Sequence, residues 1–265
     1  MNTSRTQIVA TIGPSTKTSE RIRALVGAGL DVARINMSWG SQEEDVGFIR
    51  DVRSAAEAAQ RRVPIVIDLM GPRAQEKDGH HFAGGTEIIT DKDREDIRWG
   101  ADQGVEYFAL SYVGGPEDIE VCRRAITEAG STAKIIAKIE REAALSRAPD
   151  IIAAADAVMV ARGDLGNEVP LEQIPFIQFE LVQRAKEART PVIVATEMLS
   201  SMTEHETPAR ADVTDVALAV LMGADAVMLS NETAVGKYPI EAVAMMERIL
   251  REAELRGIHT TRNPL

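Results

Sequence analysis

Two charged stretches of this sequence have the residue types and spacing of a site for an anionic ligand. The first, Val158–Gly166, is apolar until it ends in Arg162, Gly163 and Asp164. An apolar, β-branched run of this length is typical of a buried strand. The glycine leaves backbone N–H groups accessible to an anion. The stretch therefore predicts a ligand site at a strand end; the alternative is an ordinary turn.

The second stretch, Ala133–Glu140, is also strand-like and ends in Lys138 and Glu140. Alternation with a period of two places these side chains on the same side of the strand. A lysine and a glutamate in one site, beside Asp164 on the following strand, can hold a divalent cation together with an anionic substrate. The alternative is a structural network of salt bridges at the strand ends.

The elements that would position these groups alternate regularly along the chain. Apolar runs predict eight strands, at residues 7–12, 32–37, 64–69, 105–113, 133–140, 157–161, 191–196 and 226–229. Helical patterns separate the strands, including one over 142–154, whereas 73–90 has no clear period. Eight strand–helix units with short connections favour an α/β fold of the (β/α)8 TIM-barrel type over an open doubly wound sheet.

Polar side chains at the C-terminal ends of successive strands support the barrel, because a barrel brings these ends together in one active site. These side chains are Arg34, Asn36, Asp68, Ser111, Lys138, Glu140, Arg162, Asp164, Thr196, Ser230 and Glu232. An open sheet would spread them along a ridge. The sequence has neither a G-x-G-x-x-G loop opening a helix nor a Walker A loop.

Composition narrows the classes of function. The net charge of −11 argues against an extended nucleic-acid surface. The single cysteine, Cys122, excludes an intrachain disulfide and is typical of a reducing cytoplasm, where we expect the protein to be. We expect no signal peptide, because the first residues lack an apolar segment, and no apolar run approaches the length of a membrane span.

Motifs spread over nearly the whole chain resemble the barrel domain of the pyruvate kinase family, and they occur in the family's order. The matching stretches are Ile8–Ser15, Ala33–Ser38, Asp68, Gly71–Pro72, Thr90–Asp93, Ala137–Glu140, Met159–Gly166, Val194–Leu199, Pro208–Asp212, Met228–Ala234 and Gly236–Pro239. The resemblance implies a barrel of the phosphoenolpyruvate/pyruvate-binding type. It also implies that the protein forms a homo-oligomer.

The resemblance implies a role for each matching residue. Glu140 and Asp164 resemble the carboxylates that hold Mg²⁺ or Mn²⁺. Lys138 resembles the lysine that stabilises the enolate oxygen and the phosphoryl group in transfer. Backbone amides over Ala161, Arg162, Gly163 and Asp164, with Thr196, resemble the cradle for the substrate carboxylate. Thr196, Ser230 and Glu232 resemble the groups behind protonation of the enolate carbon. Asn36, Ser38 and Asp68 resemble a monovalent-cation site for K⁺, and Arg34 the catalytic arginine beside it that meets phosphate.

The sequence departs from the family pattern at residues that serve phosphoryl transfer. The family motif Asp-Thr-Lys-Gly-Pro-Glu-Ile-Arg reads Asp68-Leu-Met-Gly-Pro-Arg-Ala-Gln75 here, so Met70 replaces the lysine. Trp39 replaces a histidine and Gly114 an arginine. We expect a single barrel domain over residues 1–265, in which a short loop at 73–90, with His80 and His81, replaces the kinases' lid domain. We also expect no C-terminal regulatory domain.

These departures predict a lyase that acts through the enolate of pyruvate and depends on a divalent metal. Phosphoryl transfer needs a clamped nucleotide and a closing lid, whereas enolate chemistry needs the metal, the carboxylate cradle and the cation that are retained. The substrate would be a small 2-oxo acid: oxaloacetate for decarboxylation, or a 4-hydroxy-2-oxo acid for aldol cleavage or its reverse with pyruvate. The alternatives are a minimal pyruvate kinase that transfers phosphate from phosphoenolpyruvate to ADP, and a non-catalytic regulatory protein that binds 2-oxo acids.

Overall fold

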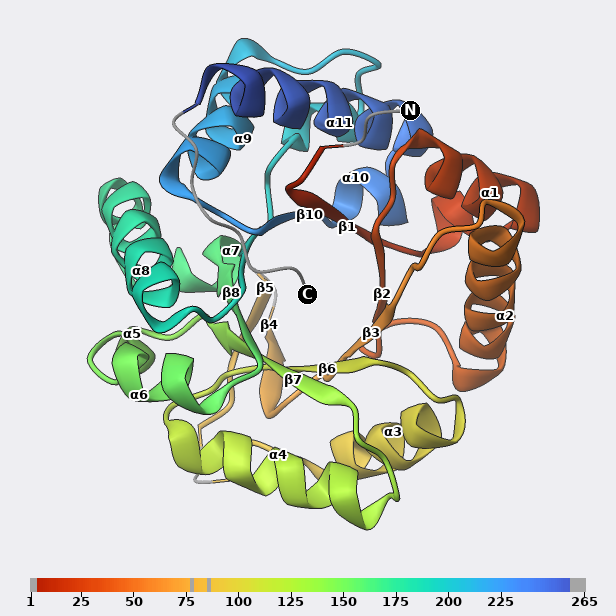
Figure 1. The fold of residues 1–265 in the computed structure, drawn as a ribbon. Helices are drawn as coiled ribbons and strands as arrows, with labels where there is room; N and C mark the ends of the chain where they lie inside the picture. The colour runs from red at the N-terminus through yellow and green to blue at the C-terminus, as the bar shows by residue number, and fades with distance from the viewer. Residues whose placement is uncertain (1–3, 77–78, 85–86, 258–265) are drawn as a thin grey trace. The chain divides into compact units, whose positions relative to one another are not determined.

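The computed structural model describes residues 4–76, 79–84 and 87–257, with the backbone alone for 74–76 and 79–81. Eight parallel strands form a closed barrel in the order β1-β10-β9-β8-β7-β6-β3-β2, which confirms the predicted (β/α)8 fold (Figure 1). The strands are β1 (Gln7–Thr11), β2 (Val32–Asn36), β3 (Ile65–Asp68), β6 (Tyr107–Leu110), β7 (Lys134–Ile139), β8 (Ala157–Ala161), β9 (Val192–Ala195) and β10 (Ala226–Leu229).

Helices follow the strands in alternation. They are α1 (Ser19–Ala28), α2 (Gln42–Ala58), α3 (Asp91–Asp102), α4 (Pro116–Glu128), α5 (Glu142–Leu145), α6 (Ala148–Ala154), α7 (Arg162–Leu165), α8 (Ile174–Ala188), α9 (Arg210–Met222), α10 (Asn231–Ala234) and α11 (Pro239–Arg256). Short 3₁₀ helices lie at η1 (Pro14–Thr16), η2 (Leu171–Gln173) and η3 (Ser200–Thr203). Among the described residues, no helix is long and apolar enough to cross a membrane.

The chain groups into two compact units. Unit 1 comprises residues 1–35, 40–65 and 193–265, and unit 2 comprises residues 36–39 and 66–192. Unit 2 carries β6, β7 and β8, whereas unit 1 carries β1, β10 and all of β9 except Val192. That the whole chain acts as a single domain stays a prediction.

The strands form because nearly all of their side chains are apolar and buried. All five residues of β8 and all four of β10 are buried, and in β7 only Lys134 is exposed. Parallel strands covered on both faces read as continuous apolar runs, because neither face meets water. This pattern is the reason that the eight strands could be predicted from sequence.

The register between strands of unit 2 sets the positions of the polar strand ends. Leu110 of β6 pairs with Ala137 of β7, so the next residues, Ser111 and Lys138, lie side by side. Lys138 in turn pairs with Met159 of β8. Parallel strands carry these groups to the same edge of the sheet, as the sequence predicts.

The prediction of one helix over 142–154 is wrong, because two short helices, α5 and α6, occupy this stretch. Pro149 lies in the first turn of α6. Proline has no N–H group and breaks the interior of a helix but is well tolerated in its first turn. The proline therefore marks the start of a second helix, whereas the prediction placed it near the end of a single one.

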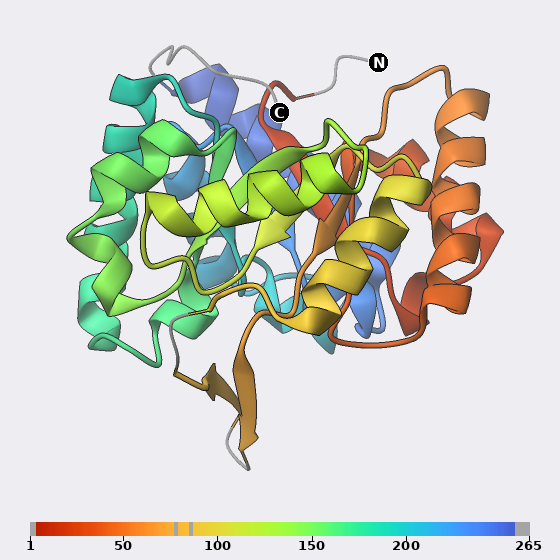
Figure 2. The ribbon, with the colours of Figure 1, turned by 90° about the horizontal axis from the view of Figure 1, so that it is seen from below.

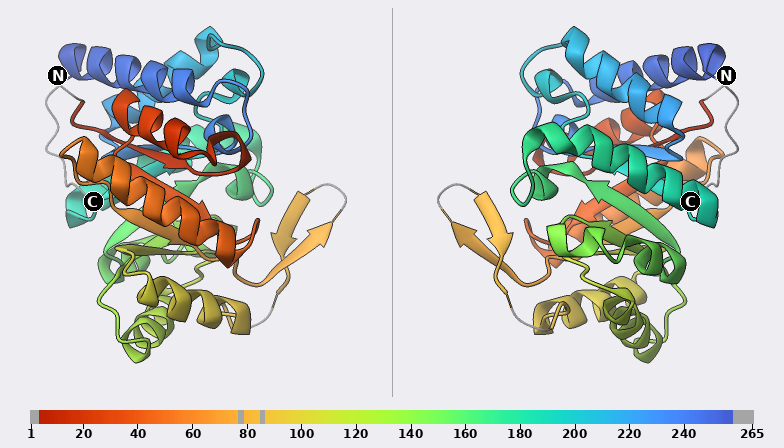
Figure 3. Two further views of the ribbon diagram at one scale, coloured as in Figure 1. Left: turned by 90° about the vertical axis from the view of Figure 1, so that its right-hand side faces the viewer. Right: turned by 90° about the vertical axis from the view of Figure 1, so that its left-hand side faces the viewer.

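A small antiparallel hairpin occupies most of the stretch that we expected to be a loop. Its strands are β4 (Arg73–Glu76) and β5 (Gly79–Phe82), and the register pairs Arg73 with Phe82. Figure 2 and Figure 3 show the hairpin standing away from the helices of unit 2. Strands of four residues are too short for a period of two to appear in the sequence. His80 and His81 lie in β5, and their side chains fall outside the described residues.

Burial makes the one cysteine of the chain chemically inert. Cys122 is fully buried in α4, as its position in the helical pattern predicts. Burial raises the pKa of its thiol to about 12, because the thiolate would lose its hydration.

Two glycines in helices give opposite predictions for stability. A Cβ on Gly100 in α3 would lie 2.8 Å from the ring of Phe108, which is fully buried, whereas a Cβ on Gly47 in α2 would meet nothing within 4 Å. We expect Gly100→Ala to destabilise the protein by about 1–3 kcal/mol through overpacking. Gly47→Ala should stabilise it by about 0.5–1 kcal/mol through helix propensity. Urea unfolding of both variants checks the prediction, and shifts of the same sign would contradict it.

Candidate active site

Lys138 is the centre of a buried polar cluster in unit 2. Its Nζ atom donates hydrogen bonds to Ser111 Oγ at 2.7 Å and to Asp68 Oδ1 at 3.2 Å. Glu140 Oε2 lies 3.2 Å from the same Nζ. All four residues are at least nine-tenths buried. The structure thus brings Asp68, from the end of β3, together with Lys138 and Glu140, which the sequence predicts to share one side of a strand.

Glu140 retains one carboxylate oxygen without a hydrogen bond. Its Oε1 accepts a hydrogen bond of 2.7 Å from the backbone N–H of Tyr112, while Oε2 accepts none from the described residues. Burial raises the pKa of the Glu140 carboxyl to about 7, and Asp164 and Asp68 add to this effect, while the Lys138 ammonium opposes it. A second cation beside Glu140 would therefore stabilise the ionised form of this buried carboxylate.

Asp164 lies half-buried in α7, directly after β8. Its charge acts on both Glu140 and Tyr112, so the two carboxylates belong to one electrostatic cluster. Burial raises the pKa of the Tyr112 phenol to about 12, with further contributions from Asp164 and Glu140. The phenol stays protonated and remains a hydrogen-bond donor beside the carboxylates.

These residues fit a divalent cation that takes only part of its ligands from the protein. Carboxylate oxygens are the ligands that Mg²⁺ and Mn²⁺ prefer, and Mg²⁺ commonly binds through one or two carboxylates plus water or substrate. Glu140 Oε2 accepts no hydrogen bond from the described residues and has the Lys138 ammonium, at 3.2 Å, as a charged neighbour, so it can also bind a cation. No group of three or more histidine, cysteine, aspartate or glutamate side chains suited to a metal occurs in the described parts of the chain. The protein would therefore supply two carboxylates, Glu140 and Asp164.

The residues predicted for a monovalent cation are placed in the same unit. Ser38 donates its backbone N–H to Asn36 Oδ1 at 3.1 Å, so these two residues form a local turn after β2. Met37 donates its backbone N–H to the carbonyl of Asp68 at 3.1 Å, which ties this turn to the end of β3. Trp39, which follows, is 63% exposed.

In unit 1, Arg34 lies buried in the middle of β2. Its Nη1 donates a hydrogen bond of 2.8 Å to Thr11 Oγ1, which itself donates to the carbonyl of Leu229 at 3.0 Å. A buried guanidinium held by a hydroxyl keeps a fixed direction.

Glu232 holds two strand ends of unit 1 together through the backbone. Its carboxylate accepts hydrogen bonds from Leu199 N at 3.1 Å and Ser230 N at 2.8 Å. Between β9 and Leu199, Thr196 and Glu197 both have positive φ angles, 70° and 54°. Two consecutive left-handed residues are costly unless the surroundings enforce them, and such strain is common at functional sites. Glu232 thus positions the turn that carries Thr196, next to Ser230.

Sequence reasoning left out three residues that shape this site: Phe82, Tyr112 and Arg141. Tyr112 follows β6 directly and has a φ of 58°, which aims its backbone N–H at Glu140. Arg141 follows Glu140, and its guanidinium stacks on the Phe82 ring. The immediate neighbourhood of Glu140 was a signal for Arg141, whereas nothing in the sequence points to Phe82.

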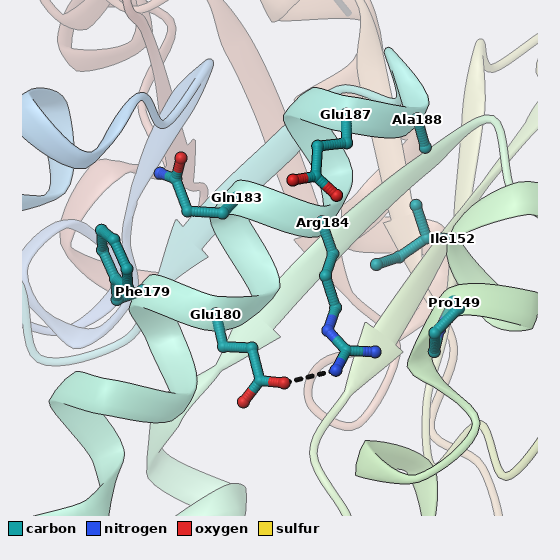
Figure 4. A pocket seen from close by; sticks show the side chains of 8 residues that line it. All are labelled: Pro149, Ile152, Phe179, Glu180, Gln183, Arg184, Glu187 and Ala188. Atoms are coloured by element: carbon teal, nitrogen blue, oxygen red, sulfur yellow. Dashed lines mark hydrogen bonds and ion pairs between the residues drawn. The ribbon is translucent and has the colours of Figure 1, made fainter.

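A separate surface hollow lies between α6 and α8 of unit 2 (Figure 4). Its lining includes Ile152 and Phe179 together with an ion pair between Arg184 and Glu180. None of the predicted site residues lines it. The hollow therefore has no part in the chemistry of the Lys138 cluster.

Comparisons with known proteins agree with the geometry. A model of the family "pyruvate kinase, barrel domain" matches residues 3–88 and 85–243. The two matches join at residues 85–88, shortly after the hairpin strands in the sequence. The chain is 36% identical to a pyruvate kinase of Mycobacterium intracellulare, over 94% of this chain and 70% of that protein. It is 35% identical to pyruvate kinase 2 of Synechocystis sp., over 96% and 58%, and 34% identical to a pyruvate kinase of Thermotoga maritima, over 94% and 71%.

These alignments run over 331 to 340 positions, more than the 265 residues of the chain. The relatives therefore carry segments that have no counterpart in this sequence.

Proposed function

Because the chain belongs to the pyruvate kinase family, we propose that it is a divalent-metal-dependent enzyme that forms or consumes the enolate of pyruvate. The observation that carries this proposal is the Lys138 cluster, in which a buried ammonium lies 3.2 Å from a buried glutamate oxygen that accepts no hydrogen bond from the described residues. A fixed cation in a desolvated site stabilises an enolate oxygen far more than it would in water.

Each residue then has a chemical role. Mg²⁺ or Mn²⁺ held by Glu140 and Asp164 would supply positive charge to the oxygens of the 2-oxo acid. Lys138, oriented by Asp68 and Ser111, neutralises the negative charge that develops on the enolate oxygen.

The remaining roles follow the family resemblance. Backbone amides from Ala161 to Asp164 take the substrate carboxylate. Thr196 and Ser230, positioned by Glu232, lie on the path of the proton to or from the C3 carbon. Asn36, Ser38 and Asp68 take K⁺, and Arg34 meets a phosphoryl group. Association into a homo-oligomer is a further expectation.

The first candidate reaction is transfer of the phosphoryl group of phosphoenolpyruvate to ADP. The three relatives named above, at about 35% identity, are pyruvate kinases, and this supports the kinase reaction over the lyase that the sequence alone had favoured. In this reaction the P–O bond of phosphoenolpyruvate breaks, a β-phosphate oxygen of ADP takes the phosphoryl group, and the enolate is protonated at C3 to give pyruvate.

The second candidate is a lyase that cleaves the C3–C4 bond of a 2-oxo acid and leaves the same enolate. Met70 and Gly114 favour it, since they stand where the family motifs have lysine and arginine. Phosphoryl transfer depends on cations that neutralise the phosphates. Each missing contact costs on the order of 3 kcal/mol, about a hundredfold in rate.

Two assays run side by side separate the candidates. Turnover near 1 s⁻¹ or above with phosphoenolpyruvate, ADP, Mg²⁺ and K⁺ establishes the first. Cleavage of oxaloacetate or a 4-hydroxy-2-oxo acid without ATP formation establishes the second. Met70→Lys should raise phosphoryl transfer by up to about a hundredfold if a missing cation limits it. Silence of the wild-type protein in both assays would contradict the enzymatic proposal.

A glycine near the cluster gives a test of its geometry. Gly71 has a φ of +66°, and a Cβ on it would lie 2.9 Å from Tyr112 Cδ2 and 3.1 Å from Ser111 Cβ. We expect Gly71→Ala to displace both neighbours, which hold Glu140 and Lys138, and to lower turnover about 10- to 100-fold. Gly84→Ala is the matched control, because Gly84 has a φ of +79° and nothing within 4 Å of its Cβ position. Equal loss of turnover in both variants would show that backbone strain alone, and not the displaced cluster, is responsible.

A further inference from the structure

Arg141 lies beside the Lys138 cluster, but none of the reactions above uses it. It follows Glu140 at the end of β7 and is half-buried. Its guanidinium carbon lies 3.7 Å from the centre of the Phe82 ring, and its Nη1 donates a hydrogen bond of 3.2 Å to the carbonyl of Tyr112. The hairpin strand β5 and the turn after β6 therefore hold the guanidinium from two sides.

Tyr112 connects this guanidinium to the metal carboxylates. Its backbone N–H binds Glu140 Oε1, while its carbonyl accepts from Arg141. Its ring lies 5.5 Å from the ring of Phe82 at an interplanar angle of 42°. Arg141 follows Glu140 in the sequence, and in the structure the backbone of Tyr112 links the two residues. Arg141 lies on the side of the hairpin, against Phe82.

Gly114 provides the room that the guanidinium occupies. A Cβ at this position would lie 3.2 Å from Arg141 Nη1. A larger residue at 114 would press on the guanidinium, so the glycine and Arg141 belong together. Position 114 is also where the family motif has an arginine, and here Arg141 is the guanidinium beside this position.

The charge of Arg141 has no carboxylate partner among the described residues, since its contacts are a ring face and one carbonyl. Lys138, by contrast, is flanked by two carboxylates. A guanidinium has five N–H donors in a planar fork that fits the oxygens of a carboxylate or phosphoryl group. Stacking on Phe82 fixes the plane of this fork and leaves Nε and Nη2 to donate to a ligand.

We propose that Arg141 is a specificity-determining residue that binds a second anionic group of the substrate, beyond the 2-oxo acid or enolpyruvate unit at Lys138, Glu140 and Asp164. The inference rests on the proposed function for the location of that unit. The shared chemistry is an oxyanion: the phosphoryl group of phosphoenolpyruvate, or the distal carboxylate of a dicarboxylic 2-oxo acid. Pyruvate has neither group and makes no use of Arg141.

Calorimetric binding of phosphoenolpyruvate, oxaloacetate and pyruvate in the presence of Mg²⁺ tests the proposal. For Arg141→Met, we expect the affinity for the doubly anionic ligand, relative to that for pyruvate, to fall about 10- to 100-fold, as the loss of charge-assisted hydrogen bonds predicts. A fall for phosphoenolpyruvate identifies the phosphoryl group as the ligand, and a fall for oxaloacetate identifies the carboxylate. Phe82→Leu should act in the same direction, about threefold to fivefold, because the stacking contact is lost.

Arg147→Met is the matched control. Arg147 pairs with the exposed Glu117 and has no contact with the cluster, so the three affinities should not change. An equal fall for all three ligands in Arg141→Met would assign Arg141 a structural role and overturn the proposal, as would three unchanged affinities. If the wild-type protein binds none of the ligands, the proposed function itself fails, and the role of Arg141 fails with it.

Discussion

Replacing Asp164 by alanine is expected to abolish metal-dependent turnover and to weaken Mn²⁺ binding by at least about a hundredfold. Asp164 and Glu140 are the two carboxylates that we assign to the cation, and each acts electrostatically on the other. With Asp164 removed, Glu140 is the one carboxylate left of the two that we assign to the cation, so the affinity for it falls. Glu140→Gln keeps the side-chain shape and should have the same effect.

Titration of bound Mn²⁺ by electron paramagnetic resonance measures this directly, without an assumption about the substrate. Asp150→Asn is the control, because Asp150 is exposed in α6 and takes no part in the cluster. Thermal unfolding should show that all three variants remain folded. Unchanged Mn²⁺ affinity in Asp164→Ala, or full turnover in excess chelator, would contradict the metal assignment.

Replacing Lys138 by methionine is expected to slow enolate formation about 10²- to 10³-fold while Mn²⁺ still binds. Methionine preserves the length of the side chain and removes the ammonium that faces the enolate oxygen. The change also leaves Asp68 and Glu140 buried without their cation, so some loss of stability is expected as well.

Lys134→Met is the matched control on the same strand. Lys134 is the exposed first residue of β7 and lies over the Tyr107 ring at 6.0 Å, outside the cluster. Its replacement should leave both metal binding and turnover unchanged. A similar rate for Lys138→Met and the wild-type protein would show that Lys138 is a structural residue.

The part of the site that could be predicted from sequence is the part that depends on strand periodicity. Side-chain alternation predicts Lys138, in β7, and Glu140, directly after it, on the same side, and the structure places Lys138 Nζ 3.2 Å from Glu140 Oε2. The eight strands were predictable for a different reason, because strands covered on both faces read as continuous apolar runs. The function of the individual residues stays a proposal that the variants above test.

The part that could not be predicted depends on backbone direction and on long-range register. The contact between Lys138 and Asp68 joins residues 70 positions apart, and only the barrel register brings them together. The hydrogen bond from Tyr112 to Glu140 depends on a positive φ that tyrosine rarely adopts. Phe82 reaches Arg141 only because a hairpin forms where the sequence shows no period.

The central claim is that this protein stabilises the enolate of pyruvate, and exchange of the methyl protons of pyruvate in D₂O measures it directly. The protein, Mg²⁺, K⁺ and pyruvate are incubated, and the methyl signal is followed by ¹H NMR, with no second substrate required. We expect exchange that depends on the metal, is lost in Asp164→Ala, and is slowed about 10²- to 10³-fold in Lys138→Met. Exchange no faster than with metal alone would contradict the claim, because both the kinase reaction and the lyase reaction pass through the same enolate.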